Sequence, residues 1–236
     1  MNIENILTVL SEDPIRNLSI TGFIENNGVQ DFKQVGQSLM IKQKSDQLWV
    51  YISSKDDSEF FMLLESLGSE DEYYASVEDW MIPHITKERN IEWKLVTMRY
   101  YLPKEITLPQ TAHTTSSLIL DDAFFIMKNA KYKDYLSIDY IIERIQNGLS
   151  SCIRIDDELA AWALTHDDGS LGFLQVMDNY KRRGFGISTT ISLAQKVIAK
   201  GKIPFANIEE DNLNAINLVN KIGFKKDRKI TWLKLK

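Results

Sequence analysis

The stretch that decides the fold is Val176-Met-Asp-Asn-Tyr-Lys-Arg-Arg-Gly-Phe-Gly186, which joins an expected strand to an expected helix. Gly184 and Gly186 allow the backbone to approach a ligand closely and to adopt angles barred to other residues. The first amides of a helix have no partner within it, and with the positive end of the helix dipole they form an anion site. Three basic residues of the same turn add positive charge: Lys181, Arg182 and Arg183. The segment therefore predicts a phosphorylated ligand.

Two other phosphate-binding loops are excluded because their consensus sequences are absent. The nucleoside-triphosphate loop needs Gly, four residues and then Gly-Lys-Ser/Thr, which is absent. The dinucleotide fingerprint Gly-x-Gly-x-x-Gly fails because Thr189 stands at its third glycine. A glycine turn carrying solvated bases is the plain alternative to a phosphate loop.

The elements around this stretch alternate between strands and helices. The expected strands are 151–155, 158–165, 171–176, 203–208 and 230–235, and the expected helices are 137–147, 185–200 and 212–222. Asp168-Gly169 lies between two strand-like runs and predicts a hairpin. This order predicts an α/β (α+β) domain with a mixed, partly parallel sheet.

The first hundred residues are harder to assign. Apolar spacing predicts helices over 60–67 and 77–87, and alternation predicts a strand over 91–102. Two prolines bracket a linker over 104–110, so we expect domains at 1–110 and 115–236. The acidic group 70–72 is expected in a surface loop, and the basic segment 225–236 at a solvated strand edge.

Composition excludes several classes of protein. The chain has 236 residues, 44% of them hydrophobic, and a net charge of −5, which argues against a general nucleic-acid binder. Its single cysteine, Cys152, is expected to be buried, and its three histidines have no metal-ligand spacing, so no metal is expected. No apolar run reaches 18 residues and no signal peptide is apparent, so we expect a cytoplasmic protein with no membrane partner.

A second motif stands downstream, Asn212-Leu-Asn-Ala-Ile-Asn-Leu-Val-Asn-Lys-Ile-Gly-Phe224. Together with the turn from Lys181 to Gly186, it resembles the paired signatures of the GNAT superfamily of acyl-CoA N-acyltransferases. The run from Glu158 to Gly186 resembles, more narrowly, the glycine N-acyltransferase-like branch. The resemblance covers 115–236 well and 1–114 weakly. It implies the GNAT fold, a mixed and mostly antiparallel sheet flanked by helices, with an N-terminal α+β domain that is a degenerate half of the same fold.

The resemblance also implies a co-substrate, acetyl-CoA or another acyl-CoA, and the residues that bind it. Strand residues Leu174, Gln175 and Val176 would hydrogen-bond the pantetheine arm. The pyrophosphate would lie on the loop beside Lys181, on the amides of Arg182, Arg183, Gly184, Phe185, Gly186 and Ile187. Asn212 would contact the cofactor through its side chain, although its position also fits a helix N-cap.

The sequence departs from the family at both catalytic positions. Val219 stands where the family often has a tyrosine general acid, and Asn207 stands where it often has a general base. Glu209 lies two residues beyond Asn207 and is the candidate catalytic base, with an ordinary exposed carboxylate as the alternative. Backbone amides near Val176 could stabilise the oxyanion.

These features predict an N-acyltransferase that moves an acyl group, expected to be acetyl, from acyl-CoA to the amine of a small molecule or amino acid by direct attack. The alternative is a catalytically silent acyl-CoA-binding or regulatory module, and a purely structural partner protein is a third reading. The expected state is a monomer or homodimer.

Overall fold

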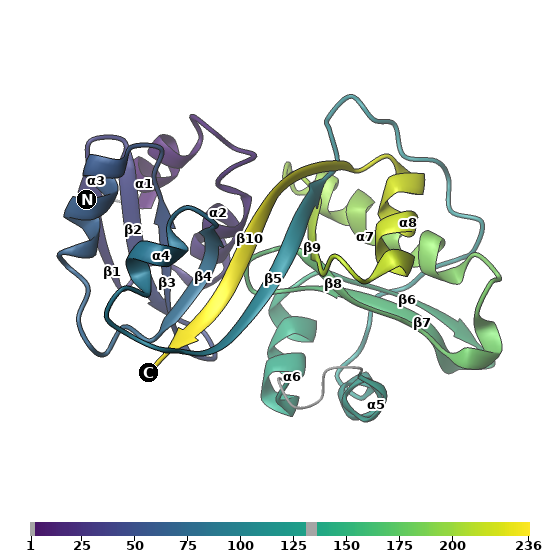
Figure 1. Ribbon diagram of the computed structural model, residues 1–236. Helices are drawn as coiled ribbons and strands as arrows, with labels where there is room; N and C mark the ends of the chain where they lie inside the picture. The colour runs from purple at the N-terminus through teal and green to yellow at the C-terminus, as the bar shows by residue number, and fades with distance from the viewer. Residues whose placement is uncertain (1–2, 131–135) are drawn as a thin grey trace. The chain divides into compact units, whose positions relative to one another are not determined.

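The computed structural model describes residues 3–130 and 136–236 (Figure 1). Contacts divide the chain into two compact units. Unit 1 runs up to Arg99 and also contains Ile208–Asp211 and Asp227–Lys236, and unit 2 comprises Tyr100–Asn207 and Asn212–Lys226. The predicted domains at 1–110 and 115–236 differ from this division, because the last strand of the chain packs with the N-terminal residues.

Hydrogen bonds join seven strands in the order β1-β2-β3-β4-β10-β5-β9. Their bounds are β1 Asp31–Val35, β2 Ser38–Lys44, β3 Leu48–Ser53, β4 Tyr73–Glu78, β10 Lys225–Leu235, β5 Ile91–Tyr101 and β9 Phe205–Ile208. Neighbours β1 and β2, β2 and β3, and β4 and β10 are antiparallel, whereas β3 and β4 are parallel.

In unit 1, four helices accompany the strands: α1 Ile3–Leu10, α2 Leu18–Asn27, α3 Asp57–Leu64 and α4 Ile82–Ile85. Successive residues of β2 enter different cores, as strand geometry requires. Leu39 and Ile41 pack with α1 and α2, whereas Met40 packs with α3 and α4. Burial on both faces of this sheet therefore comes from alternation within the strands.

The helix predicted over 77–87 is wrong in its first part. Val77 and Glu78 end strand β4, and only Ile82–Ile85 is helical. Val77, Met81 and Ile85 share one buried cluster, so a strand followed by a short helix buries the same residues that a continuous helix would. Pairing of β4 with both β3 and β10 decides the outcome, and local spacing cannot encode such pairing.

Two expectations about charged segments need correction. The acidic group 70–72 lies in a loop with Glu70 exposed, as expected, but the Asp71 side chain is fully buried, with Oδ2 lying 2.6 Å from Lys42 Nζ. The basic segment at the C-terminus is not an edge, because β10 lies between β4 and β5 (Figure 1). Part of its charge is neutralised by carboxylates of the same unit, as in the ion pairs Arg228–Glu78 and Lys234–Glu92.

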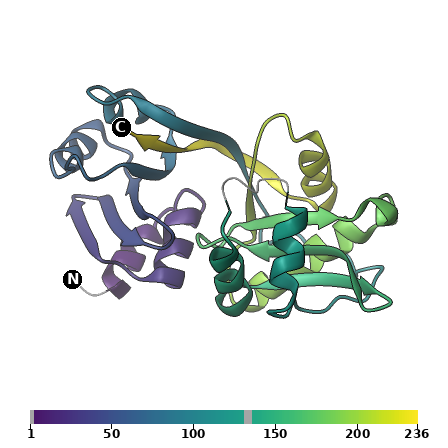
Figure 2. The same cartoon turned by 90° about the horizontal axis from the view of Figure 1, so that it is seen from below.

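Unit 2 contains a three-stranded antiparallel sheet in the order β6-β7-β8. Its strands are β6 Ser150–Ile155, β7 Glu158–Thr165 and β8 Leu171–Val176, and its helices are α5 Asp122–Asn129, α6 Ile138–Asn147, α7 Phe185–Ala199 and α8 Leu213–Ile222. Figures 1 and 2 show α5 and α6 on one face of this sheet and α7 on the other. These bounds confirm the predicted hairpin and the helices at 137–147, 185–200 and 212–222.

Cys152 is fully buried, which confirms the expectation. It packs in a cluster with Trp162 of β7, Ile126 of α5 and Ile141 of α6. No helix in the described part of the chain is long and apolar enough to cross a membrane.

Candidate functional site: a basic loop at the start of α7

The segment between β8 and α7 forms a tight loop. A single 3-10 turn, Asp178–Tyr180, is followed by three exposed residues and then by Gly184, the N-cap of α7. Gly184 has a φ of 80°, in the left-handed region, and Arg182 also has a positive φ of 60°. Glycine tolerates this conformation without strain, whereas arginine does not. The loop is therefore held in a shape that its sequence only partly favours.

The N-terminus of α7 opens onto this loop. The first intrahelical hydrogen bond runs from the Ser188 N–H to the Gly184 carbonyl at 3.0 Å. The amides of Phe185, Gly186 and Ile187 precede that bond, so helix geometry leaves them without a partner in the helix. Aligned amides at the positive end of a helix are suited to an anion.

A cavity of about 440 Å³ lies against this helix start. It brings together most of the loop residues predicted from sequence and three residues of α8. The lining residues are Val176, Tyr180, Lys181, Arg182, Gly184, Phe185, Gly186, Ile187, Asn217, Leu218 and Lys221. Leu174, Gln175, Arg183 and Asn212 are not among them. Four lining residues were not predicted from the sequence: Tyr180, Asn217, Leu218 and Lys221. The helical spacing of 212–222 could have placed the three α8 residues on one face.

The charge of the cavity wall is positive. Lys181, Arg182 and Lys221 line it, and all three side chains are exposed to solvent. Lys181 Nζ also lies 2.6 Å from Asp178 Oδ1, and the hydrogen bond from Lys181 lowers the pKa of the Asp178 carboxyl. Because both partners of that pair are exposed, the pair is weak and leaves Lys181 able to turn toward a ligand.

Strand β8, which leads into the loop, is the edge strand of its sheet within the described residues. Its pairing with β7 shifts register between Trp162 and Leu164, and Phe173 opposite this shift has a φ of 54°. Such a bulge turns backbone groups away from the neighbouring strand. A positive φ at an aromatic residue is strained and is typical of functional positions. Leu174, Gln175 and Val176 follow directly and are half-buried.

The remaining predicted residues lie as follows. The Asn212 side chain caps α8 by accepting the Ala215 N–H at 3.3 Å, so its N-cap role is present and its cofactor contact stays a prediction. Val219 is buried and lies outside the cavity lining. Glu209 was expected on the strand with Asn207, but β9 ends at Ile208, and Glu209 groups with unit 1.

A carboxylate that the sequence analysis did not weigh lies beside Asn207. Asp168 is 3% exposed, and its Oδ2 accepts the Asn207 Nδ2 at 3.4 Å. Its Oδ1 accepts both the backbone N–H and the hydroxyl of Ser170, at 2.9 and 2.6 Å. The hairpin predicted at Asp168-Gly169 thus brings a buried carboxylate to the Asn207 side chain on β9.

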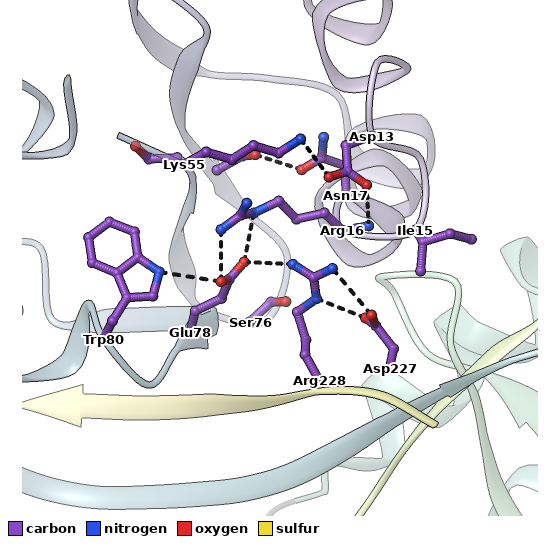
Figure 3. A network of polar contacts seen from close by, with 12 residues as sticks. Asp13, Ile15, Arg16, Asn17, Lys55, Ser76, Glu78, Trp80, Asp227 and Arg228 are labelled. Atoms are coloured by element: carbon purple, nitrogen blue, oxygen red, sulfur yellow. Dashed lines mark hydrogen bonds and ion pairs between the residues drawn. The ribbon is translucent and has the colours of Figure 1, made fainter. Parts of the chain in front are cut away.

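Unit 1 holds a separate polar network, shown in Figure 3. Glu78 is its hub, because its carboxylate pairs with Arg16 at 2.7 Å and Arg228 at 3.2 Å. Asp13 pairs with Lys55 at 2.7 Å; burial raises the pKa of Asp13, but the Lys55 hydrogen bond and other contacts lower that pKa overall. Every carboxylate of the network faces a cation, so the network stabilises unit 1 by linking its segments to one another.

The described residues contain no group of three or more His, Cys, Asp or Glu side chains placed to hold a metal ion.

Comparison with known proteins finds a family model that matches part of the chain and solved structures with a similar fold. The family model described as "FR47-like protein" matches residues 151–233. A search of curated sequences finds no match. A solved Drosophila protein matches with a TM-score of 0.81 at 18% identity, covering 99% of this chain and 95% of that one.

Two bacterial structures carry the same fold. A GCN5-related N-acetyltransferase from Kribbella flavida matches with a TM-score of 0.59 at 13% identity, over 94% of this chain and 97% of its own. An acetyltransferase of the GNAT family from Colwellia psychrerythraea matches with a TM-score of 0.52 at 12% identity, over 98% and 97%. The chain has the fold of the GNAT acetyltransferases, which confirms the predicted fold class.

Proposed function

We propose that the protein is an acyl-CoA-dependent N-acyltransferase that transfers an acetyl group to a small-molecule amine. The observation that carries the proposal is the cavity at the start of α7, where the first residues of the helix, Arg182 and Lys221 surround one space at the end of β8, an edge strand among the described residues. A diphosphate needs clustered donors and positive charge, and a pantetheine amide needs a free strand edge. This site offers both, one directly after the other along the chain.

The residues fit the parts of acetyl-CoA in chain order. The amides of Phe185, Gly186 and Ile187 would hold the diphosphate. The free edge of β8 would hydrogen-bond the pantetheine arm, and the bulge at Phe173 would aim an amide at the thioester carbonyl. Lys221 at the cavity rim is suited to a further phosphate.

The reaction we propose is direct attack of the amine nitrogen on the thioester carbonyl carbon. A C–N bond forms, the carbonyl electrons move to oxygen, and the amide at the β8 bulge stabilises that oxyanion. The C–S bond then breaks, and the thiolate takes a proton from solvent. The amine loses its proton to a carboxylate, for which Glu209 and Asp168 are the two candidates, each reached directly or through a water.

The acceptor is proposed to be a small amine or amino acid, as in the glycine N-acyltransferase-like branch, and neither nucleic acid nor membrane is proposed as a partner. The cytoplasm is the proposed location, and unit 1 is proposed to be the degenerate half of the same fold.

Calorimetric titration with acetyl-CoA tests the binding step, and thiol release across a panel of amines tests the chemistry. We expect saturable binding and amine-dependent thiol release, reduced by Glu209→Gln or by Asp168→Asn. Absence of acetyl-CoA binding overturns the proposal. Binding with no thiol release on any amine favours the silent acyl-CoA-binding module. That alternative is supported by Val219 and Asn207, because neither side chain can act as a general acid or base.

A further inference from the structure

The loop that lines the cavity is hydrogen-bonded by a residue outside it, His113, which lies in the segment before α5. The His113 Nε2 lies 2.8 Å from the backbone carbonyl oxygen of Arg183. A carbonyl oxygen only accepts, so Nε2 must carry the hydrogen and donate it. The ring also packs edge-to-face on Phe185, the first residue of α7, with ring centroids 4.6 Å apart.

The Arg183 carbonyl, which accepts this hydrogen bond, lies where the backbone of the loop is most strained. Arg183 stands between two residues of positive φ, Arg182 and Gly184. Residues other than glycine are disfavoured at positive φ, and they keep this conformation only where surrounding contacts hold it. The direction of the Arg183 carbonyl determines how the following amides point, so a bond to that oxygen fixes the entry into α7.

His113 can act as a fixed point because its own segment is fastened to unit 2. We call residues 113–117 the strap. Thr115 exchanges a hydroxyl hydrogen bond of 2.8 Å with Ser192 of α7. Ser116 pairs with Cys152 of β6 through two backbone hydrogen bonds, of 2.9 and 2.8 Å. Lys196 donates to the Ser117 hydroxyl at 2.9 Å.

Two side chains of the loop, Tyr180 and Arg183, extend the stack of rings that His113 forms with Phe185. Tyr180 stacks on Phe185 with centroids 5.8 Å apart, and the Arg183 guanidinium lies over the Tyr180 ring at 5.6 Å. Phe185 is thus held between His113 and Tyr180.

We propose that His113 is a positioning residue for the phosphate-binding loop: through its bond to the Arg183 carbonyl, it keeps the amides of Phe185 to Ile187 aimed at a diphosphate. The inference rests on the proposed function for the identity of the ligand. The state of the loop itself is measurable without any ligand.

Trypsin reports on the loop directly, because Lys181, Arg182 and Arg183 are exposed cleavage points within it. We expect His113→Leu, which removes the donor, to raise the cleavage rate at these residues roughly 3- to 10-fold, as expected for loss of one hydrogen bond. His113→Gln should restore protection, since its amide nitrogen can donate from a similar position. The cut sites are read by mass spectrometry of the intact protein and its fragments.

Acetyl-CoA affinity is the second readout, and Gly201→Ala is the matched control. Gly201 lies beyond the far end of α7 and has a φ of 74°, so Gly201→Ala should lower the melting temperature through backbone strain while its acetyl-CoA Kd changes less than 2-fold. His113→Leu should raise the Kd roughly 3- to 10-fold, and His113→Gln should stay near wild type.

The outcomes separate the two claims. Wild-type cleavage and wild-type Kd for His113→Leu overturn the role of His113. Equal effects of Gly201→Ala and His113→Leu on the Kd also overturn it, since general destabilisation would then suffice. Absence of acetyl-CoA binding by the wild type overturns the proposed function instead, and the trypsin comparison still decides whether His113 holds the loop.

Discussion

A side chain at Gly186 should close the cavity that we assign to the cofactor. A Cβ built on Gly186 would lie 3.3 Å from Val176 Cγ2 and 3.4 Å from Leu218 Cδ1, and both of these residues line the cavity. The alanine methyl is therefore a tight fit that its neighbours can absorb. The two extra methyl groups of valine project further between β8 and α8, where a ligand would have to pass.

The magnitude follows from the contacts that Gly186→Val would block. A hydrogen bond to a charged group contributes about 1.5–3 kcal/mol, and displacement of a diphosphate from the helix start removes at least two such bonds. The expected loss is about 3–6 kcal/mol, which corresponds to roughly 10²- to 10⁴-fold in Kd. Gly186→Ala should weaken binding only a few-fold.

The assay is calorimetric titration of acetyl-CoA at 25 °C, paired with thermal melting. Gly201→Ala is the matched control, because Gly201 follows the other end of α7, has a φ of 74° and has nothing within 4 Å of a built Cβ. It should lower stability by about 1–2 kcal/mol through backbone strain and leave binding unchanged. Gly186→Val binding acetyl-CoA within 3-fold of wild type would refute the assignment of this cavity.

Further predictions concern charge and stability. Asp71→Ala leaves Lys42 buried without its partner and should lower the unfolding free energy by about 3 kcal/mol in urea titrations; a loss below about 1 kcal/mol would contradict the pairing. Glu78→Ala should cost a similar ~3 kcal/mol, since it removes the hub of the network in Figure 3. Lys221→Ala should weaken acetyl-CoA binding roughly 5-fold at low salt and less at high salt, and a salt-independent effect would argue against a phosphate contact. Burial lowers the pKa of His166 from 6.5, Asp168 opposes this and Arg144 adds to it. Below about pH 6.5, the His166 side chain therefore binds a proton in the unfolded chain before it does so in the folded chain. The free energy of unfolding should fall as the pH drops below that value. His166→Gln should flatten that slope in melts at several pH values, and an unchanged slope would assign it to other groups.

Local sequence was a good guide wherever the chemistry is local. The turn from Lys181 to Gly186 needs glycine conformations, basic residues and a helix start, and all three are read from neighbouring residues. Asn212 likewise shows its capping role three residues from the amide that it accepts. The strand, loop and helix that form the cavity wall could therefore be predicted without a structure.

Pairing between distant segments could not be predicted in the same way. β4 carries apolar residues at a spacing that also fits a helix, and only its pairing with β3 and β10 makes it a strand. The segment that became β10 has six basic residues among the last twelve, which is typical of an exposed edge. Carboxylates more than a hundred residues away neutralise part of that charge and allow it inside the sheet.

The sequence by itself determined the glycine turn, its basic residues and the order of the elements around it, because glycine angles, helix starts and hydrophobic periodicity act over a few residues. Only the tertiary structure decided that Lys221 faces the cavity, that Asp168 lies beside Asn207 and that His113 grips the Arg183 carbonyl. Each of these contacts joins residues about 40 or more positions apart, and the sequence carries no local signal for such a pair. Strap and loop meet because both are fastened to α7 and the sheet beneath it, so the candidate site is shaped by packing that no single segment encodes.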